Sequence, residues 1–148
     1  MSPEPRDRGA KPGRRDGGPA GRRPAQANRP SSTPPDPARR VAFNLLRAVD
    51  ERAAYANLTL PGLLREASLS GRDAAFATEL GYGTLRGQGT YDRILAACID
   101  RPLERVDPPV RDVLRLGVHQ LLGMRVPSHA AVSATVDLAR TAVGPGPA

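Results

Sequence analysis

The sequence contains very few of the residues that build cross-links, metal centres and base-stacking surfaces. Cys98 is the single cysteine among 148 residues, so no disulfide can form within the chain and no thiolate metal site can be assembled. His119 and His129 are the only histidines, which makes a metal site built from imidazoles improbable. Tryptophan is absent and aromatic residues make up 3% of the chain, so a stacking platform for RNA bases is not supported.

Long apolar runs and phosphate-binding glycine loops are missing as well. No run of about 18 apolar residues occurs, so the sequence predicts no membrane span, and its N-terminus lacks the apolar core of a secretory signal. No glycine-rich loop follows a strand pattern, which excludes dinucleotide sites and P-loops. No spacing suggests a Ser/His/Asp or Cys/His catalytic set. We therefore expect a cytoplasmic chain without catalytic, cofactor-binding or metal-binding residues of its own.

Basic charge is plentiful but unevenly placed. The chain carries 22 Lys+Arg against 15 Asp+Glu, a net charge of +7. Residues 1–40 hold ten basic and four acidic residues (+6), and residues 41–148 hold twelve and eleven (+1). All basic residues except Lys11 are arginines, whose planar guanidinium groups suit phosphates and base stacking. The codon bias of a GC-rich genome would explain the same preference.

Residues 1–35 are rich in proline, glycine and arginine and contain no aromatic or large aliphatic residue after Met1. Such a segment cannot bury enough apolar surface to offset the entropy cost of ordering it, so we predict a disordered tail. Its arginine pairs at 14–15 and 22–23 are typical of short arms that bind nucleic acid. A solvated linker with only weak, salt-sensitive attraction to polyanions fits the same composition.

An ordered domain is predicted from residue 36 onward, and its clearest part is a pair of helices within residues 107–140. Asp-Pro at 107–108 is a start signal, because aspartate caps a first turn and proline needs no N–H partner there. Val-Pro at 126–127 should stop the first helix, and Ser128 should cap the second. The residues expected to face the core are Val110, Val113, Leu114, Gly117, Val118, Leu121 and Leu122, then Val132, Thr135, Val136, Ala139 and Val143.

Residues 37–53 form another amphipathic pattern after the same Asp-Pro signal. The residues expected to be buried are Ala38, Val41, Ala42, Leu45, Leu46 and Val49. Arg39 and Arg40 lie in the first turn, where positive charge opposes the helix dipole. Two arginines kept there despite that cost indicate an anionic partner. Arg47 lies on the same helix, and a solvated polar face is the competing interpretation for all three.

The middle of the chain completes the predicted fold. A connector at 53–60 is followed by helices over 61–68, 70–86 and 90–100, with a break expected at Gly87-Gln88-Gly89. Gly81 and Gly83 would let a neighbouring helix approach closely, which would compensate for the poor helix propensity of glycine. Six helices with short connections and no credible strand predict an all-α fold, an antiparallel helical bundle.

The cysteine, the two histidines and one possible ion pair are expected to have mainly structural roles. Cys98 is expected to be a small core residue, and His119 a residue at the edge of the apolar face. His129, in a first turn, is expected to cap or pack. Glu79 and Arg86 lie seven residues apart, hence on one helix face, where they form a surface ion pair or anchor a ligand.

Three segments of the chain form a recognisable set: ARRVAFNLL (38–46), ELGYGTLRGQGTYDRIL (79–95) and VRDVLRLGVHQLLGMRVPSHAAVSATVDLAR (110–140). They resemble the N-terminal domain of the Fmu/Sun/RsmB family of small-subunit ribosomal RNA (cytosine-C5) methyltransferases. That domain is similar to the transcription antitermination factor NusB. The resemblance covers roughly residues 37–143.

The resemblance implies a bundle of about seven helices in two sub-bundles, of which about six are present here. It also implies RNA binding, with ribosomal RNA the expected partner. Arg39 and Arg40 match the basic start of the first helix with which NusB binds RNA, and Arg47 is added because it shares that helix. Domain 36–148 would then position ribosomal RNA for a methyltransferase domain that uses S-adenosylmethionine.

The family continues beyond the resemblance into a final NusB-like helix and a Rossmann-like domain with catalytic Pro-Cys cysteines. The sequence reaches Ala148 first, and Cys98 has no Pro-Cys context, so we expect a C-terminally incomplete domain with part of its core uncovered. Two other functions fit: a stand-alone NusB-type antitermination factor that binds RNA, and a helical protein-interaction module. The near-neutral charge of residues 41–148 supports the last.

Overall fold

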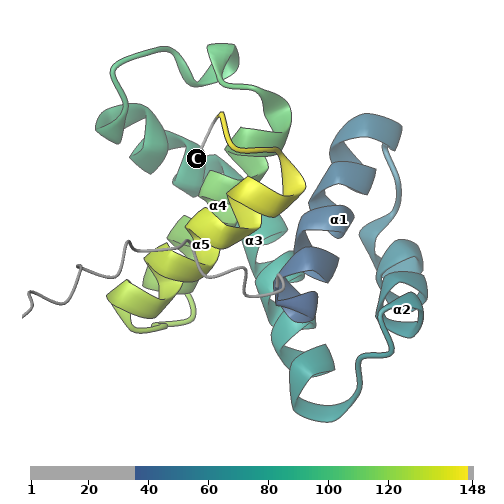
Figure 1. Ribbon diagram of the computed structural model, residues 1–148. Coiled ribbons are helices and arrows are strands. Elements are labelled where there is room, and N and C mark those ends of the chain that lie inside the picture. Colours follow the sequence, from purple (N-terminus) through teal and green to yellow (C-terminus); the bar gives the residue numbers. More distant parts are fainter. Residues whose placement is uncertain (1–35, 147–148) are drawn as a thin grey trace, which may run out of the picture. The chain divides into compact units, whose positions relative to one another are not determined.

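The computed structural model describes residues 36–146, and this part of the chain consists of helices and connecting loops (Figure 1). In chain order the elements are α1 (Pro37–Arg52), α2 (Ala56–Glu66), α3 (Gly71–Cys98), the 3₁₀ turn η1 (Leu103–Arg105), α4 (Pro108–Leu122) and α5 (Ser128–Ala142). The predicted all-α class is confirmed. None of the helices in residues 36–146 combines the length and the apolar character that a membrane crossing requires. The predicted disordered tail, residues 1–35, lies outside the described residues.

Helix α1 begins where its Asp-Pro signal predicts. The Asp36 carboxylate accepts a hydrogen bond of 2.9 Å from the backbone N–H of Ala38, and Pro37 occupies the first helical position. The helix ends before Ala53, which adopts a left-handed conformation with φ 49°. The residues predicted to face the core are buried, apart from Val49, which is half-buried.

Helix α3 runs without interruption for 28 residues, so the predicted break at Gly87-Gln88-Gly89 is wrong. It packs against both α1 and α4, and this packing outweighs the cost of about 1 kcal/mol that each glycine imposes on a helix. Two predicted helices are therefore one, and the described residues contain five α-helices instead of six.

Three helix boundaries also differ from the prediction by a few residues. Helix α2 starts at Ala56, inside the predicted connector, and contains Pro61, because the buried Leu60 anchors its first turns against α1. Helix α4 ends at Leu122, five residues before the proline expected to stop it. Ser128 is the first residue of α5 instead of its cap, and neither it nor Asp107 makes a capping hydrogen bond.

The core of the described domain has two apolar clusters that share α1 and α3. The first consists of Ala42, Phe43, Leu46, Leu80, Val113, Leu116, Leu138 and Ala139. The second consists of Ala38, Val41, Leu45, Leu60 and Ala77. Leu45 and Leu46 are neighbours on α1 but enter different clusters, so opposite sides of this helix contribute to the two clusters. Gly81 makes the α1–α3 contact possible, since a Cβ there would lie 2.8 Å from Leu45 Cδ2, and the predicted close approach is confirmed.

The face of α4 that enters the core differs from the predicted one. Val113 and Gly117 are buried as predicted, but Leu114, Val118 and Leu121 are half-buried and Leu122 is exposed. The other residues that α4 buries are Asp112, Arg115, Leu116, His119 and Gln120. Helical periodicity could not identify this face because four of those five side chains are polar or charged. The helix therefore directs a polar row inward and leaves an apolar row largely outside.

Candidate functional site

Arg39, the first of the three predicted RNA-binding arginines, is bonded within the domain. Its Nε donates a 2.7 Å hydrogen bond to Gln120 Oε1 on α4, and its Nη1 forms an ion pair with Asp36. The guanidinium carbon lies 4.9 Å from the ring centroid of Phe76. Gln120 in turn contacts Thr135 on α5 at 3.4 Å. Arg39 thus ties the start of α1 to α3, α4 and α5.

Arg47 is also engaged in internal contacts. Its guanidinium donates to Asp112 on α4 at 2.8 Å and to Asp50 and Glu51 on its own helix at 3.1 and 2.6 Å. Burial opposes its charge, but the bonds to Glu51 and Asp112 outweigh this effect and raise its pKa above the usual arginine value. The side chain is permanently cationic and already neutralised by three carboxylates.

Arg40 has the most available guanidinium of the three. Its Nη2 donates a 3.3 Å hydrogen bond to the backbone carbonyl of Thr141 near the end of α5. Within residues 36–146 it pairs with no carboxylate. Among the described residues, the charge of Arg40 therefore meets only the partial negative charge at the C-terminus of α5.

A buried row of charged side chains continues from Arg47 across the bundle. Asp112 is 1% exposed and accepts from Arg47 and, at 3.0 Å, from Arg115 one turn further along α4. Arg115 also donates twice to the Asp92 carboxylate of α3, each bond 2.7 Å long. Burial disfavours its charge, but Asp92 and Asp112 more than compensate and raise its pKa. Arg47, Asp112, Arg115 and Asp92 form this charged row. The row links α1, α4 and α3, and its two positive and two negative charges sum to zero.

A second polar group joins α3 to α4 around His119. The Tyr91 hydroxyl and His119 Nδ1 lie 2.6 Å apart, and His119 Nε2 lies 3.5 Å from a carboxylate oxygen of Glu79. Glu79 also pairs at 3.4 Å with the exposed Arg86, which confirms the predicted surface pair. The His119 ring rests against Gly83, where a side chain would collide with it. Because Tyr91 is buried, this group holds two helices together and offers no open reaction centre.

The amino-acid sequence matches the profile of the NusB family over residues 36–148. The chain belongs to the NusB family. The match spans α1 to α5, so the two polar groups described above lie inside a NusB domain.

Sequence relatives connect this NusB domain to methyltransferases. It is 56% identical over 110 residues to a Mycobacterium tuberculosis protein whose name assigns it provisionally to the methyltransferases, covering 74% of this chain and 24% of the relative. It is 34% identical over 101 residues to the ribosomal RNA small subunit methyltransferase B of Pseudomonas putida, covering 68% and 23%. The chain therefore spans about a quarter of the length of these relatives.

Solved structures share the fold of the NusB domain. One is a crystal structure of a plectonemic RNA supercoil, with TM-score 0.67 and 23% identity, covering 74% of this chain and 81% of that one. Another holds the antitermination factors NusB and NusE with double-stranded RNA, with TM-score 0.65 and 24% identity, covering 72% and 81%. The predicted NusB-like architecture is confirmed.

Three predictions about single residues of the NusB domain are wrong. Cys98 is exposed at the end of α3, because this last turn extends beyond the packed part of the bundle. His119 is buried and faces α3 instead of lying at the edge. His129 is exposed in the first turn of α5 and makes no side-chain hydrogen bond within the described residues, so it neither caps nor packs.

The buried imidazole makes the stability of the NusB domain depend on pH. Burial lowers the pKa of His119 below the usual value of 6.5, against the attraction of Glu79. The unfolded chain therefore binds more protons, and we expect the free energy of unfolding to fall as the pH drops from about 7 to 5.5. Thermal unfolding at a series of pH values measures this.

His119→Gln should remove most of the pH dependence, whereas His129→Gln, at the exposed histidine, should leave it unchanged. The same pH dependence in all three proteins would contradict the assignment to His119.

Proposed function

We propose that this NusB domain binds ribosomal RNA and positions it for methylation of a cytosine by a catalytic domain outside this chain. The observation that carries the proposal is its similarity, confined to about a quarter of their length, to proteins named ribosomal RNA small subunit methyltransferase B. A NusB structure with double-stranded RNA supports the binding step. The expected location of the protein is the cytoplasm, where ribosomal RNA is modified.

The RNA contact should rest on arginine–phosphate pairs. Within the proposed set of Arg39, Arg40 and Arg47, the internal ion pairs give an order of importance. Arg40 lacks a carboxylate partner among the described residues and is the direct contact, together with the arginines of residues 1–35. Arg39 and Arg47 contribute less, because a phosphate would compete with Asp36 and Gln120 for one and with three carboxylates for the other.

S-adenosylmethionine, the expected methyl donor, does not fit the described residues. Residues 36–146 are helices and loops, with no glycine-rich loop between a strand and a helix to receive the nucleoside. The cofactor is therefore assigned to the catalytic domain of the longer protein, and no catalytic residue is proposed in this chain.

Antitermination is the second candidate function, favoured by the fold shared with the NusB–NusE complex. In that case the domain would bind RNA as one subunit of a transcription complex. A methyltransferase assay separates the two: the domain joined to its downstream coding sequence should methylate small-subunit ribosomal RNA. A downstream sequence that encodes no methyltransferase would favour antitermination.

Arg40→Glu should weaken binding to a small-subunit ribosomal RNA fragment about three- to tenfold and lower the slope of log affinity against log salt by about 0.7–0.9, the loss of one phosphate contact. Fluorescence anisotropy across a salt series measures both. Arg52→Glu is the matched control, because Arg52 is exposed at the far end of the same helix. Equal losses in both variants would remove Arg40 from the interface, and an unmodified chain that binds no RNA would overturn the proposed function.

A further inference from the structure

A hollow beside the connector between α3 and α4 contains an arginine that has no partner. The hollow has a volume of about 740 Å³ and is lined by the end of α3, by η1 and by the start of α4, with Arg93, Glu104 and Arg111 among its residues. Arg111 Nε is buried and has no hydrogen-bond partner within residues 36–146. Such an atom needs an explanation, since nearly all buried polar groups in folded proteins are bonded.

The arginines that are bonded inside the domain differ from Arg111 in this respect. Arg39, Arg47 and Arg115 each donate to at least one carboxylate. Arg111 precedes Arg115 by one helical turn and therefore lies on the same side of α4, yet it pairs with no carboxylate of the described residues. Asp92, the α3 carboxylate in the lining, already accepts two bonds of 2.7 Å from Arg115. The guanidinium of Arg111 is therefore left over.

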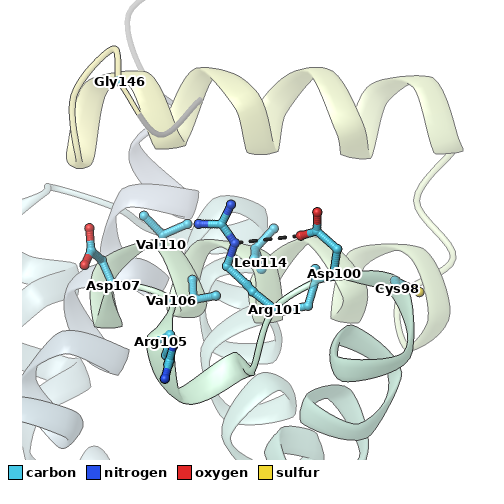
Figure 2. Close-up of a pocket in the computed structure, with 10 residues that line it drawn as sticks. Cys98, Asp100, Arg101, Arg105, Val106, Asp107, Val110, Leu114 and Gly146 are labelled. Carbon is cyan, nitrogen blue, oxygen red and sulfur yellow. Dashed lines mark ion pairs between the residues drawn. The ribbon is translucent and has the colours of Figure 1, made fainter.

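The charge around the hollow is positive once the internal pairs are counted. Arg101 also lines it, but in Figure 2 its side chain points toward α5, and it pairs with Asp100 at 3.8 Å. The charges that remain are those of Arg93, Arg111 and the exposed Glu104, two positive against one negative. No lining residue comes from α5. The hollow is therefore suited to an anion.

We propose that Arg93 and Arg111 bind a phosphate group in this hollow. The planar guanidinium group presents N–H donors in a fork that suits phosphate oxygens, and Nε–H is one of them. Because no internal bond holds the Arg111 guanidinium, the side chain can turn toward a phosphate and bring Nε with it without losing a hydrogen bond.

The source of this phosphate rests on the proposed function: it is a backbone phosphate of ribosomal RNA, held at a second contact. Figure 1 shows the connector after α3 well apart from the first turn of α1, so this contact is separate from the one assigned to Arg40. An RNA that reaches both places is held at two points of the domain, which fixes its orientation as well as its position.

The Nε–Hε signal of Arg111 in an arginine side-chain NMR spectrum tests the phosphate contact directly in the full 148-residue chain. Arg111→Gln lacks this group and therefore assigns the signal. Inorganic phosphate, titrated from about 1 to 50 mM at constant ionic strength, should shift the signal saturably. A signal that moves no more than with chloride overturns the proposal.

Binding of the small-subunit ribosomal RNA fragment tests the source of the phosphate. Arg93→Glu should weaken it about three- to tenfold and lower the salt slope by about 0.7–0.9. This loss should multiply with that of Arg40→Glu, because the two contacts share no partner. Arg72→Glu is the matched control, since Arg72 is exposed near the start of the same helix, about 30 Å away. Equal losses in Arg93→Glu and Arg72→Glu overturn the RNA contact.

The two measurements separate this inference from the proposed function. A chain that binds no RNA, but whose Arg111 signal shifts saturably with inorganic phosphate, would refute the RNA function and keep the phosphate site, with free phosphate as its ligand. Arg111→Gln should unfold at the same urea concentration as the unmodified chain or a higher one, because it removes a charge that no carboxylate of residues 36–146 pairs. A lower midpoint would assign Arg111 a structural role and overturn its assignment to the site.

Discussion

Asp112→Ala is expected to destabilise the domain by about 3–5 kcal/mol, the usual consequence of removing one member of a buried ion-pair network. Asp112 is 1% exposed and joins Arg47 on α1 to Arg115 on α4. Its removal withdraws one of the two carboxylates that Arg115 contacts among residues 36–146 and takes from Arg47 its partner on α4. Neither guanidinium can lose its proton to escape burial. Urea unfolding followed by circular dichroism measures the change.

Asp137→Ala is the matched control for this result. Asp137 pairs with Arg140 at 3.8 Å on the outside of α5, and that arginine side chain is 54% exposed. Removal of this pair should change the free energy of unfolding by less than about 1 kcal/mol. If the two variants unfold at the same urea concentration, the charged row does not contribute to stability as its geometry indicates.

Gly83→Ala should destabilise the domain by about 1–3 kcal/mol, although alanine is the better helix former. The added methyl would occupy the space of the His119 ring and lie 2.8 Å from Glu79 Oε1. The ring cannot simply rotate away, because its Nδ1 is bonded to Tyr91 and the ring also packs closely against Gly123. Either the α3–α4 contact widens or the hydrogen bond to Tyr91 breaks.

Gly89→Ala on the same helix provides the comparison. No atom outside the local backbone lies within 4 Å of a Cβ built at Gly89, so this variant should be stabilised by up to about 1 kcal/mol. Thermal melts of the two single variants should therefore shift in opposite directions. Shifts of the same sign would show that helix propensity, and not contact with His119, decides the outcome.

The sequence predicts helices best where one face is uniformly apolar. In α1, Val41, Leu45 and Leu46 follow the helical period and all three are buried. In α3 the local pattern is misleading, because Gly87 and Gly89 weaken the helix signal while the contacts that keep the helix intact come from α1 and α4. Local propensity contains no information about those distant contacts.

The arginine contacts of the site are less predictable for the same reason. Arg39 and Arg47 can be placed on the polar side of α1 from their spacing, but their partners Gln120 and Asp112 lie 81 and 65 positions away. The local indication is the Asp-x-x-Arg spacing of Asp112 and Arg115 in α4. Such a pair reads as a surface ion pair unless the helix is known to be rotated inward.

The division of the core into two apolar clusters has a mechanical consequence. Ala42 and Leu45, on the same turn of α1, belong to different clusters, and Leu80 and Ala77 divide α3 in the same way. Unravelling of α1 or α3 would expose both clusters to water, whereas detachment of α2 would open only the second cluster and detachment of α5 only the first. We therefore expect the two halves of the core to open together only when α1 or α3 unfolds.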